Sequence, residues 1–422
     1  MHKLAYVSVL GLALATGCGD DKKGGDTGGG GMAGPTIKIG SMHTLTGDYA
    51  DYGPPADNAV KLAVKEINDA GGVLGGRKLE VFYTDSRSDA TGATAPSMDL
   101  ITNKKVTAIT EDNSSSISTE ILKYSTPANV AQISASSTSP SLTKSGDNFF
   151  RLAPADTLQA KVLAKQAKDG GLMKVAVLYE MDDVYGMGLN DAFKTSFEAG
   201  GGMVSLSMAF DASAASFRMP VQALWAAGAD GILLVTTTES AAKVLQEFKS
   251  QQGPRPAPRF LLPDSLHSDS FLTNLAAAKS LVEGCIGTAP TTPSDAPDMA
   301  RAATFNAAYK AAYGMDPAQY NDASYDSIYI IAAAIEKAKS DAPADVLAQI
   351  ANVTGKQPMA TGATFGPGQW TEMRAAIVAG MDVNYQGASG TCDLDENGDP
   401  SGYYNVWTVM GGMLMDGMTV KP

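Results

Sequence analysis

The chain has 422 residues, of which 44% are hydrophobic and 18% are charged, and its formal net charge at pH 7 is −13. This length predicts about two domains of roughly 150–200 residues each. The acidic balance argues against nucleic acid as a partner and against adhesion to an anionic membrane by charge. No internal stretch reaches the roughly 18 apolar residues of a spanning helix.

Residues 1–17 are typical of a signal peptide. Lys3 precedes an apolar core from Leu4 to Ala15, which is too short to span a bilayer. The ending LATGC resembles a bacterial lipobox, although Ala15 stands where leucine is usual. The sequence therefore predicts lipidation of Cys18, with ordinary signal cleavage as the alternative. Residues 18–35 would then be a lipidated flexible tether, because this Gly/Asp/Lys tract buries nothing.

From residue 36 the chain alternates predicted strands with predicted helices. Apolar residues at Val60, Ala63, Val64 and Ile67 form the stripe of the first helix. The strands of this first series are expected at 36–45, 77–86, 106–112 and 131–136, and those of a second series at 174–182, 203–210, 231–238 and 259–265. Such βαβ succession predicts two parallel sheets covered by helices, with the first unit ending near Ala155.

The tail from residue 393 predicts a β-hairpin with polar turns. Its DLDENGD stretch places Asp393, Asp395, Asn397 and Asp399 where a calcium loop has ligands. Tyr404 occupies the position that requires a bidentate glutamate, and the flanks are strand-like. A plain turn is therefore favoured over a calcium site.

Motifs of catalysis are missing from the sequence. It has no HExxH, CxxC or GxSxG, and no glycine-rich phosphate loop follows a predicted strand. Outside the signal peptide the histidines are His43 and His267, too few for a zinc site with such sparse cysteines. We expect no enzyme, no metal and no cofactor.

Three hydroxyl-rich loops follow predicted strands, at residues 111–118, 134–142 and 235–240. In open α/β sheets, ligands bind outside these strand ends, where hydroxyls and helix N-termini hold anions such as carboxylates. Any one loop is also what a helix N-cap looks like. The three together favour a site for a small polar ligand.

Several stretches together resemble the leucine/isoleucine/valine-binding proteins, which are type I periplasmic binding proteins that serve ABC importers. They are residues 37–89, 136–143, 150–159, 184–189, 282–290 and 385–407, in matching order and spacing. The resemblance implies an α/β fold of two Rossmann-like lobes, joined by a three-segment hinge that closes on ligand. The N-terminal lobe would take 36–155 plus 290–390, and the C-terminal lobe 156–289 plus 391–422.

The resemblance also bears on the cysteines. If Cys18 carries lipid, Cys285 and Cys392 remain as an even pair in an exported protein. Both would lie beside crossover segments on the side of the second lobe. A disulfide between them is therefore expected, with two separate buried thiols as the alternative.

The family's amino-acid site carries over residue by residue. The ligand carboxylate would meet the hydroxyls of Ser115, or Ser116 if the local gap falls otherwise, and of Thr138. The ammonium would meet the carboxylate of Asp264 and the backbone of Ser136.

Aromatic positions that flank the ligand in the family match Tyr52 and Tyr185. A further family tyrosine falls near Thr237. This smaller, more polar wall puts leucine or valine specificity in doubt.

The sequence thus predicts an extracytoplasmic lipoprotein that binds a small polar ligand, most simply an amino acid, and delivers it to an ABC permease. Its only membrane contact would be the N-terminal lipid. The alternatives are a protein that binds an amide, urea or an aromatic acid, and a ligand-sensing receptor without transport.

Overall fold

The computed structural model describes residues 34–112, 114–144, 146–292, 296–355 and 361–422. The predicted signal peptide, Cys18 and the tether as far as residue 33 lie outside these ranges, so those expectations stay predictions. Within the described ranges, no helix is both long enough and apolar enough to cross a bilayer.

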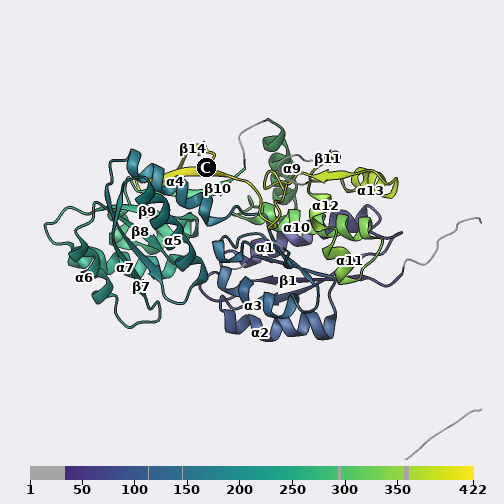
Figure 1. Cartoon of the computed structure of the whole chain (residues 1–422), viewed down its shortest axis with the longest axis horizontal. Helices are drawn as coiled ribbons and strands as arrows, with labels where there is room; N and C mark the ends of the chain where they lie inside the picture. Colours follow the sequence, from purple (N-terminus) through teal and green to yellow (C-terminus); the bar gives the residue numbers. More distant parts are fainter. Residues whose placement is uncertain (1–33, 113, 145, 293–295, 356–360) are drawn as a thin grey trace, which may run out of the picture. The chain divides into compact units, whose positions relative to one another are not determined.

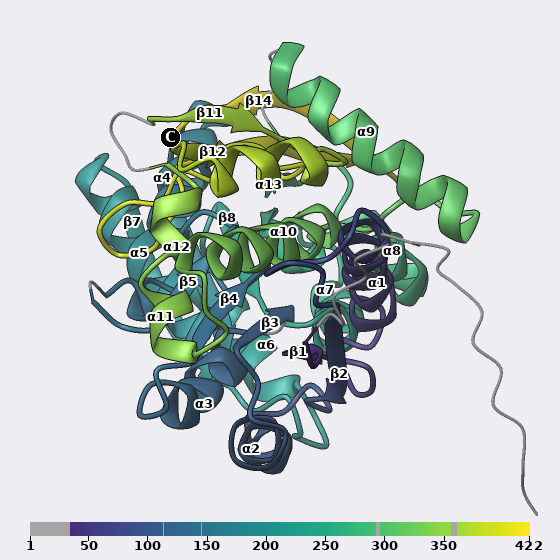
Figure 2. The ribbon, with the colours of Figure 1, turned by 90° about the vertical axis from the view of Figure 1, so that its right-hand side faces the viewer.

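Five parallel strands form the sheet of the first lobe, in the order β2-β1-β3-β4-β5. They are β1 (Ile37–His43), β2 (Leu79–Asp85), β3 (Ala108–Asp112), β4 (Ala131–Ser134) and β5 (Phe149–Arg151). Neighbouring residues of β3 face opposite sides of this sheet, as strand geometry requires. Ala108 packs with the helices α1 (Gly53–Asp69) and α10 (Asn321–Ala338), whereas Ile109 packs with α2 (Ala90–Met98) and α3 (Ser115–Ser125). Figure 2 shows α10 and α2 on opposite sides of these strands.

Seven strands form the sheet of the second lobe, in the order β14-β13-β10-β9-β8-β6-β7. They are β6 (Lys174–Glu180), β7 (Met203–Phe210), β8 (Gly231–Val235), β9 (Arg259–Leu262), β10 (Ile286–Thr291), β13 (Tyr403–Met410) and β14 (Met413–Val420). The strands from β6 to β10 pair in parallel, and the C-terminal hairpin β13–β14 adds to β10 antiparallel. Two parallel-sheet lobes confirm the predicted α/β fold class.

Two buried clusters cover the faces of the second sheet. One contains residues of α4 (Asp156–Asp169) and α5 (Val184–Ala199), and the other contains residues of α6 (Arg218–Ala227), α7 (Thr238–Gln252) and α8 (Asp269–Asn274). Figure 1 shows β7, β8 and β9 in teal, together with α6 and α7. The remaining elements include α9 (Ala296–Tyr313), α11 (Pro343–Leu347), α12 (Ile350–Val353), α13 (Trp370–Val378), and the strand pair β11 (Ala363–Phe365) and β12 (Val383–Tyr385).

The chain passes between the lobes after β5, after β10 and after β12. The sequence placed the third crossing at residue 391, but Cys392 and Leu394 are buried in the core of the first lobe. That crossing therefore comes later, before β13 begins at Tyr403. The second crossing also shifts, because β10 stays in the second sheet as far as Thr291, beyond the predicted boundary at 289.

Candidate functional site

A cavity of about 60 Å³ lies where strand ends of both sheets meet. Residues that follow β1, β3 and β4 line it from the first lobe, and residues that follow β6 and β9 line it from the second lobe. The position agrees with the rule that ligands bind at the carboxyl ends of parallel strands. The lining consists of Thr44, Tyr49, Tyr52, Ser114, Ser115, Ser136, Tyr185, Asp264, Ser265 and Tyr320.

Five of the predicted site residues line this cavity. They are Tyr52, Ser115, Ser136, Tyr185 and Asp264, which come from five separate stretches of the sequence. The predicted residues Ser116, Thr138 and Thr237 are not among the lining residues, and the Thr138 side chain lies against Asp156.

Asp264 carries the carboxylate of the cavity. It opens the short helix η3 (Asp264–Leu266) after β9 and is 5% exposed. Tyr185 of the second lobe donates its hydroxyl to Oδ1 at 2.9 Å, and Tyr320 of the first lobe donates to Oδ2 at 2.5 Å. Burial first, and the charge of Asp264 next, raise the pKa values of both tyrosines well above the usual value. Both hydroxyls therefore stay protonated, and the carboxylate keeps lone pairs for a further donor.

A second carboxyl, Asp156, lies near Asp264. It is the first residue of α4 and is fully buried. Its pKa is raised well above the usual value, chiefly by burial and then by the charge of Asp264, which the neighbouring Thr138 hydroxyl offsets in part. Asp264 is the carboxylate among the described lining residues, and no Lys, Arg or His lies beside it there, which favours a ligand with a cationic group.

The first-lobe side of the cavity offers hydroxyls at a helix N-terminus. Ser115 is the first residue of α3, and its Oγ accepts a hydrogen bond of 3.1 Å from the backbone amide of Ser139. Amides in the first turn of a helix have no intrahelical partner, and the helix dipole favours negative charge there. This wall can therefore hold a carboxylate.

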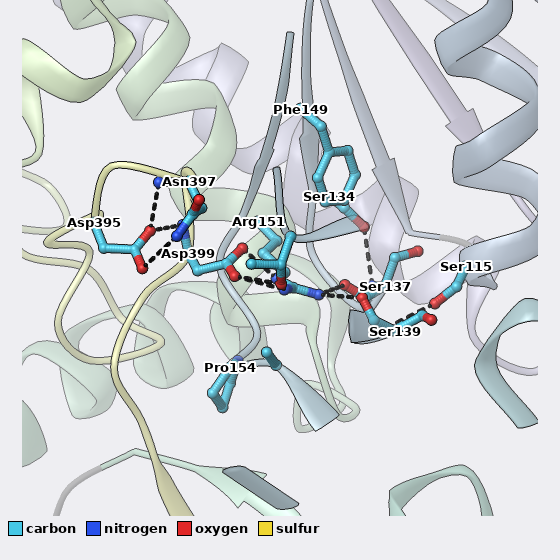
Figure 3. A network of polar contacts seen from close by, with 12 residues as sticks. Ser115, Ser134, Ser137, Ser139, Phe149, Arg151, Pro154, Asp395, Asn397 and Asp399 are labelled. Atoms are coloured by element: carbon cyan, nitrogen blue, oxygen red, sulfur yellow. Dashed lines mark hydrogen bonds and ion pairs between the residues drawn. The ribbon is translucent and has the colours of Figure 1, made fainter. Parts of the chain in front are cut away.

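Arg151 supports this wall from behind, at the end of β5, and is fully buried. Its Nη1 donates to the carbonyl oxygen of Ser139 at 2.9 Å, and its Nε and Nη2 form a bidentate pair with Asp399 at 2.6 and 2.7 Å. Figure 3 shows Arg151 between Asp399 on one side and Ser137, Ser139 and Ser115 on the other. Since Ser139 holds Ser115, the ion pair fixes the serine segment on which the hydroxyl wall depends.

The DLDENGD stretch forms a turn, as the sequence favoured. Asp395 accepts hydrogen bonds from the backbone amides of Asn397 and Asp399 at 2.8 and 3.0 Å. Asp393 accepts from the amide of Gln386 at 2.7 Å, and Asp399 is paired with Arg151. Nowhere in the part of the chain that the structure describes do three acidic, His or Cys side chains gather as metal ligands would.

The other predicted site residues have structural partners. Ser116 donates its hydroxyl to Asp183 Oδ1 at 2.9 Å and accepts from the amide of Val184 at 2.9 Å, and so joins α3 to the start of α5 in the second lobe. Thr237 caps α7 by accepting from the amide of Ser240 at 3.2 Å. A threonine directly before a predicted helix is typical of such a cap.

Sequence reasoning missed half of the cavity lining. Ser114 and Ser265 adjoin residues that it named, and Tyr49 lies three residues before Tyr52, so adjacency was the available signal. Tyr320 gave no such signal, because it lies at the start of α10, far in sequence from every residue that was named. Its backbone is left-handed, with φ +67°.

The predicted disulfide between Cys285 and Cys392 is wrong. Both are free, buried thiols. Cys285 belongs to the core of the second lobe and Cys392 to the core of the first lobe, since the chain crosses only after residue 392. Thiols in two different cores cannot meet the short Cβ–Cβ distance of a disulfide.

Comparison with known proteins identifies the family of the chain. The chain matches the family described as periplasmic binding protein over residues 36–382. It is 26% identical over 311 residues to an amino acid binding protein of Pseudomonas aeruginosa, and this alignment covers 73% of this chain and 80% of the relative. It is 30% identical over 171 residues to the Leu/Ile/Val-binding protein BraC3 of Rhizobium johnstonii. This alignment covers 40% of this chain and 46% of the relative, so it spans about half the length of that protein.

Among solved structures, the fold is similar to that of a leucine-binding protein of Thermotoga maritima. The TM-score is 0.76 at 23% identity, and the match covers 92% of this chain and 99% of the other. Since the family match spans most of the sequence, the chain belongs to the periplasmic binding proteins, as a type I, Leu/Ile/Val-binding-protein-like member of a family that binds substrates and does not catalyse reactions.

Proposed function

We propose that the protein binds an α-amino acid as its zwitterion in the cavity between the lobes. The ammonium pairs with Asp264, and the carboxylate meets Ser115, Ser136 and the N-terminus of α3. The observation that carries the proposal is the Asp264 carboxylate, which two tyrosine hydroxyls orient opposite a wall of serines. An ammonium is the group that satisfies a buried carboxylate with charge-assisted hydrogen bonds.

The biological role that we propose is delivery of this amino acid to an ABC permease from the extracytoplasmic side of the membrane. Family membership supports this role, as do relatives named as amino acid and Leu/Ile/Val-binding proteins. The lipid anchor at Cys18 belongs to the same proposal, since a tethered binding protein stays near its permease.

The size of the cavity bears on the ligand. About 60 Å³ is less than half of the roughly 150 Å³ of a cavity that holds benzene. It fits the α-amino and carboxylate end of a ligand better than it fits a whole branched side chain. A simple aromatic acid would in addition leave Asp264 without a cation, at the cost of an unpaired buried charge.

The test is calorimetry on the purified protein with alanine, propionate and ethylamine, which share a small skeleton and differ in their charged groups. We expect measurable binding of alanine and at least 100-fold weaker binding of the other two. A thermal-shift assay is the second readout, because a ligand at 100 times its Kd adds about 2.7 kcal/mol of stability. Propionate that binds as tightly as alanine would overturn the proposal.

A further inference from the structure

A second cavity, of about 160 Å³, adjoins the first and shares Tyr320 with it. We call it the hinge cavity, because segments 152–154, 290–292 and 401–403, from the three passages between the lobes, line it. Residues 318–320 and 322–323, around the start of α10, complete most of the wall. The hinge cavity is the larger of the two, and no role has been assigned to it above.

Tyr320 lies at the boundary between the two cavities. Its backbone has φ +67° and ψ −2°, a left-handed conformation that is unfavourable for a residue with a side chain. Backbone strain of this kind concentrates at ligand clamps and persists only where its surroundings enforce it. Here the hydroxyl bond to Asp264 holds the ring, and the Ser324 hydroxyl donates to the backbone carbonyl of Tyr320 at 3.1 Å.

The hinge cavity is lined with hydrogen-bonding groups. Gln319 contributes an amide nitrogen and an amide oxygen that are both buried and without a hydrogen-bond partner among the described residues. Leaving such groups unpaired in the folded protein is unfavourable, so a ligand that pairs with them gains affinity. Hydroxyls of Thr291, Thr292, Ser389 and Ser401 lie in the same lining.

The charge of this lining limits which ligand groups the hinge cavity can bind. Asp322 is its only charged side chain within the described residues, and no Lys, Arg or His contributes to it. Unlike Asp264, Asp322 is only half-buried and accepts a hydrogen bond from the backbone amide of Ala323 at 2.8 Å, so it does not require a cation from the ligand. A ligand group with a negative charge would find no counter-charge there. An uncharged amide, in contrast, has the donor and the acceptor that the Gln319 amide lacks.

From these observations we propose that the hinge cavity receives the side chain of the amino-acid ligand, that this side chain ends in a carboxamide, and that Tyr320 and Gln319 determine this specificity. The inference rests on the proposed function. The first cavity is too small for a long side chain, and the adjoining one, which meets it at Tyr320, has the volume and the polar lining to receive it.

The test is calorimetry with alanine, glutamine, leucine and glutamate on the purified protein. We expect glutamine to bind at least tenfold more tightly than alanine and leucine, and glutamate to bind more weakly than alanine. In the Gln319→Leu variant, glutamine should lose at least tenfold in affinity while alanine is unchanged. Gln222→Leu makes the same change on an exposed residue away from both cavities and should leave all four affinities unchanged.

The outcomes separate this inference from the proposed function. If alanine binds and glutamine binds no better, or if Gln319→Leu leaves the ratio of glutamine to alanine affinity unchanged, the side-chain assignment is overturned and the amino-acid proposal stands. If none of the four amino acids binds, the amino-acid proposal itself is wrong, and this inference falls with it.

Discussion

The two walls of the ligand cavity differ in chemistry. The first-lobe wall has the neutral hydroxyls of Thr44, Ser114 and Ser115, whereas the second-lobe wall has the carboxylate of Asp264. Two further acids of the second lobe, Glu180 and Asp183, are half-buried, and this desolvation raises their pKa values above the usual value. A ligand with both an anionic and a cationic end can satisfy the two walls only when they face each other. Because the two walls differ in charge, we expect a ligand that carries both an anionic and a cationic group to favour the arrangement in which the lobes lie together.

The largest expected effect comes from the ion pair behind the hydroxyl wall. Arg151→Met leaves Asp399 as an unpaired buried charge and should lower the free energy of unfolding by about 3–5 kcal/mol. Urea denaturation of the variant and the unchanged protein measures this difference in the free energy of unfolding. Arg77→Met, which breaks a partly exposed pair with Asp341, is the matched control and should cost about 1 kcal/mol or less. Equal losses in the two variants would contradict a special role for Arg151.

The next effect tests the acidic wall. Asp264→Asn keeps the shape of the side chain but removes the charge that faces the ligand ammonium. We expect alanine to bind about 2–5 kcal/mol more weakly in calorimetry, because a buried ammonium is left without its counter-charge. Asp316→Asn, at an exposed pair with Lys310, should leave affinity unchanged. Unchanged affinity in Asp264→Asn would mean that the two walls do not divide the ligand charges as proposed.

The hydroxyl wall has its own test. Ser115→Ala removes one hydrogen bond to the ligand carboxylate and should weaken binding by about 1.5–3 kcal/mol, the range for bonds to charged groups. Ser213→Ala, on an exposed loop, is the control. If ethylamine, which has no carboxylate, lost as much affinity as alanine, the effect would lie in the shape of the wall and not in carboxylate binding.

The last effect is the smallest within any one pH unit and concerns the contribution of Asp156 to the pH dependence of stability. Because its pKa in the folded protein is raised from the usual 3.8, the folded state binds more protons than the unfolded state above that pH. The stability contribution is complete below pH 3.8 and is lost as pH rises toward the folded pKa, at up to about 1.4 kcal/mol per pH unit.

Asp156→Asn cannot titrate, so its unfolding free energy should fall less with rising pH than that of the unchanged protein. Thermal melts of both proteins between pH 4 and 8 measure the difference. Parallel curves would show that Asp156 is ionised in the fold. Glu180 and Asp183 contribute in the same direction in both proteins and cancel in the comparison.

Local sequence patterns predicted the two sheets and the strand ends that carry the site, because burial and turn chemistry act on neighbours in the chain. They also placed Ser115 and Asp264, which stand directly after strands. Tyr320 could not be predicted in this way, since only the packing of α10 brings it to Asp264, 56 residues away. Asp156 resembles an ordinary helix start, and its significance comes from the burial that tertiary structure imposes. The predicted disulfide was wrong for a related reason. A count of cysteines does not show in which core each thiol is buried, since only tertiary structure decides that.

The position of the Arg151–Asp399 pair has a consequence for the order of events during binding. Arg151 ends the last strand before the first passage to the second lobe, and Asp399 lies shortly before the third. The pair thus fixes the starts of the first and third passages to the first lobe. A hinge movement of the second lobe would therefore have to occur in the residues that follow Arg151 and Asp399. The serine segment is thereby fastened to the first lobe, whereas Asp264 belongs to the second lobe. For the amino-acid ligand that we propose, we expect the carboxylate to contact the serine hydroxyls first and the ammonium to meet Asp264 when the lobes close.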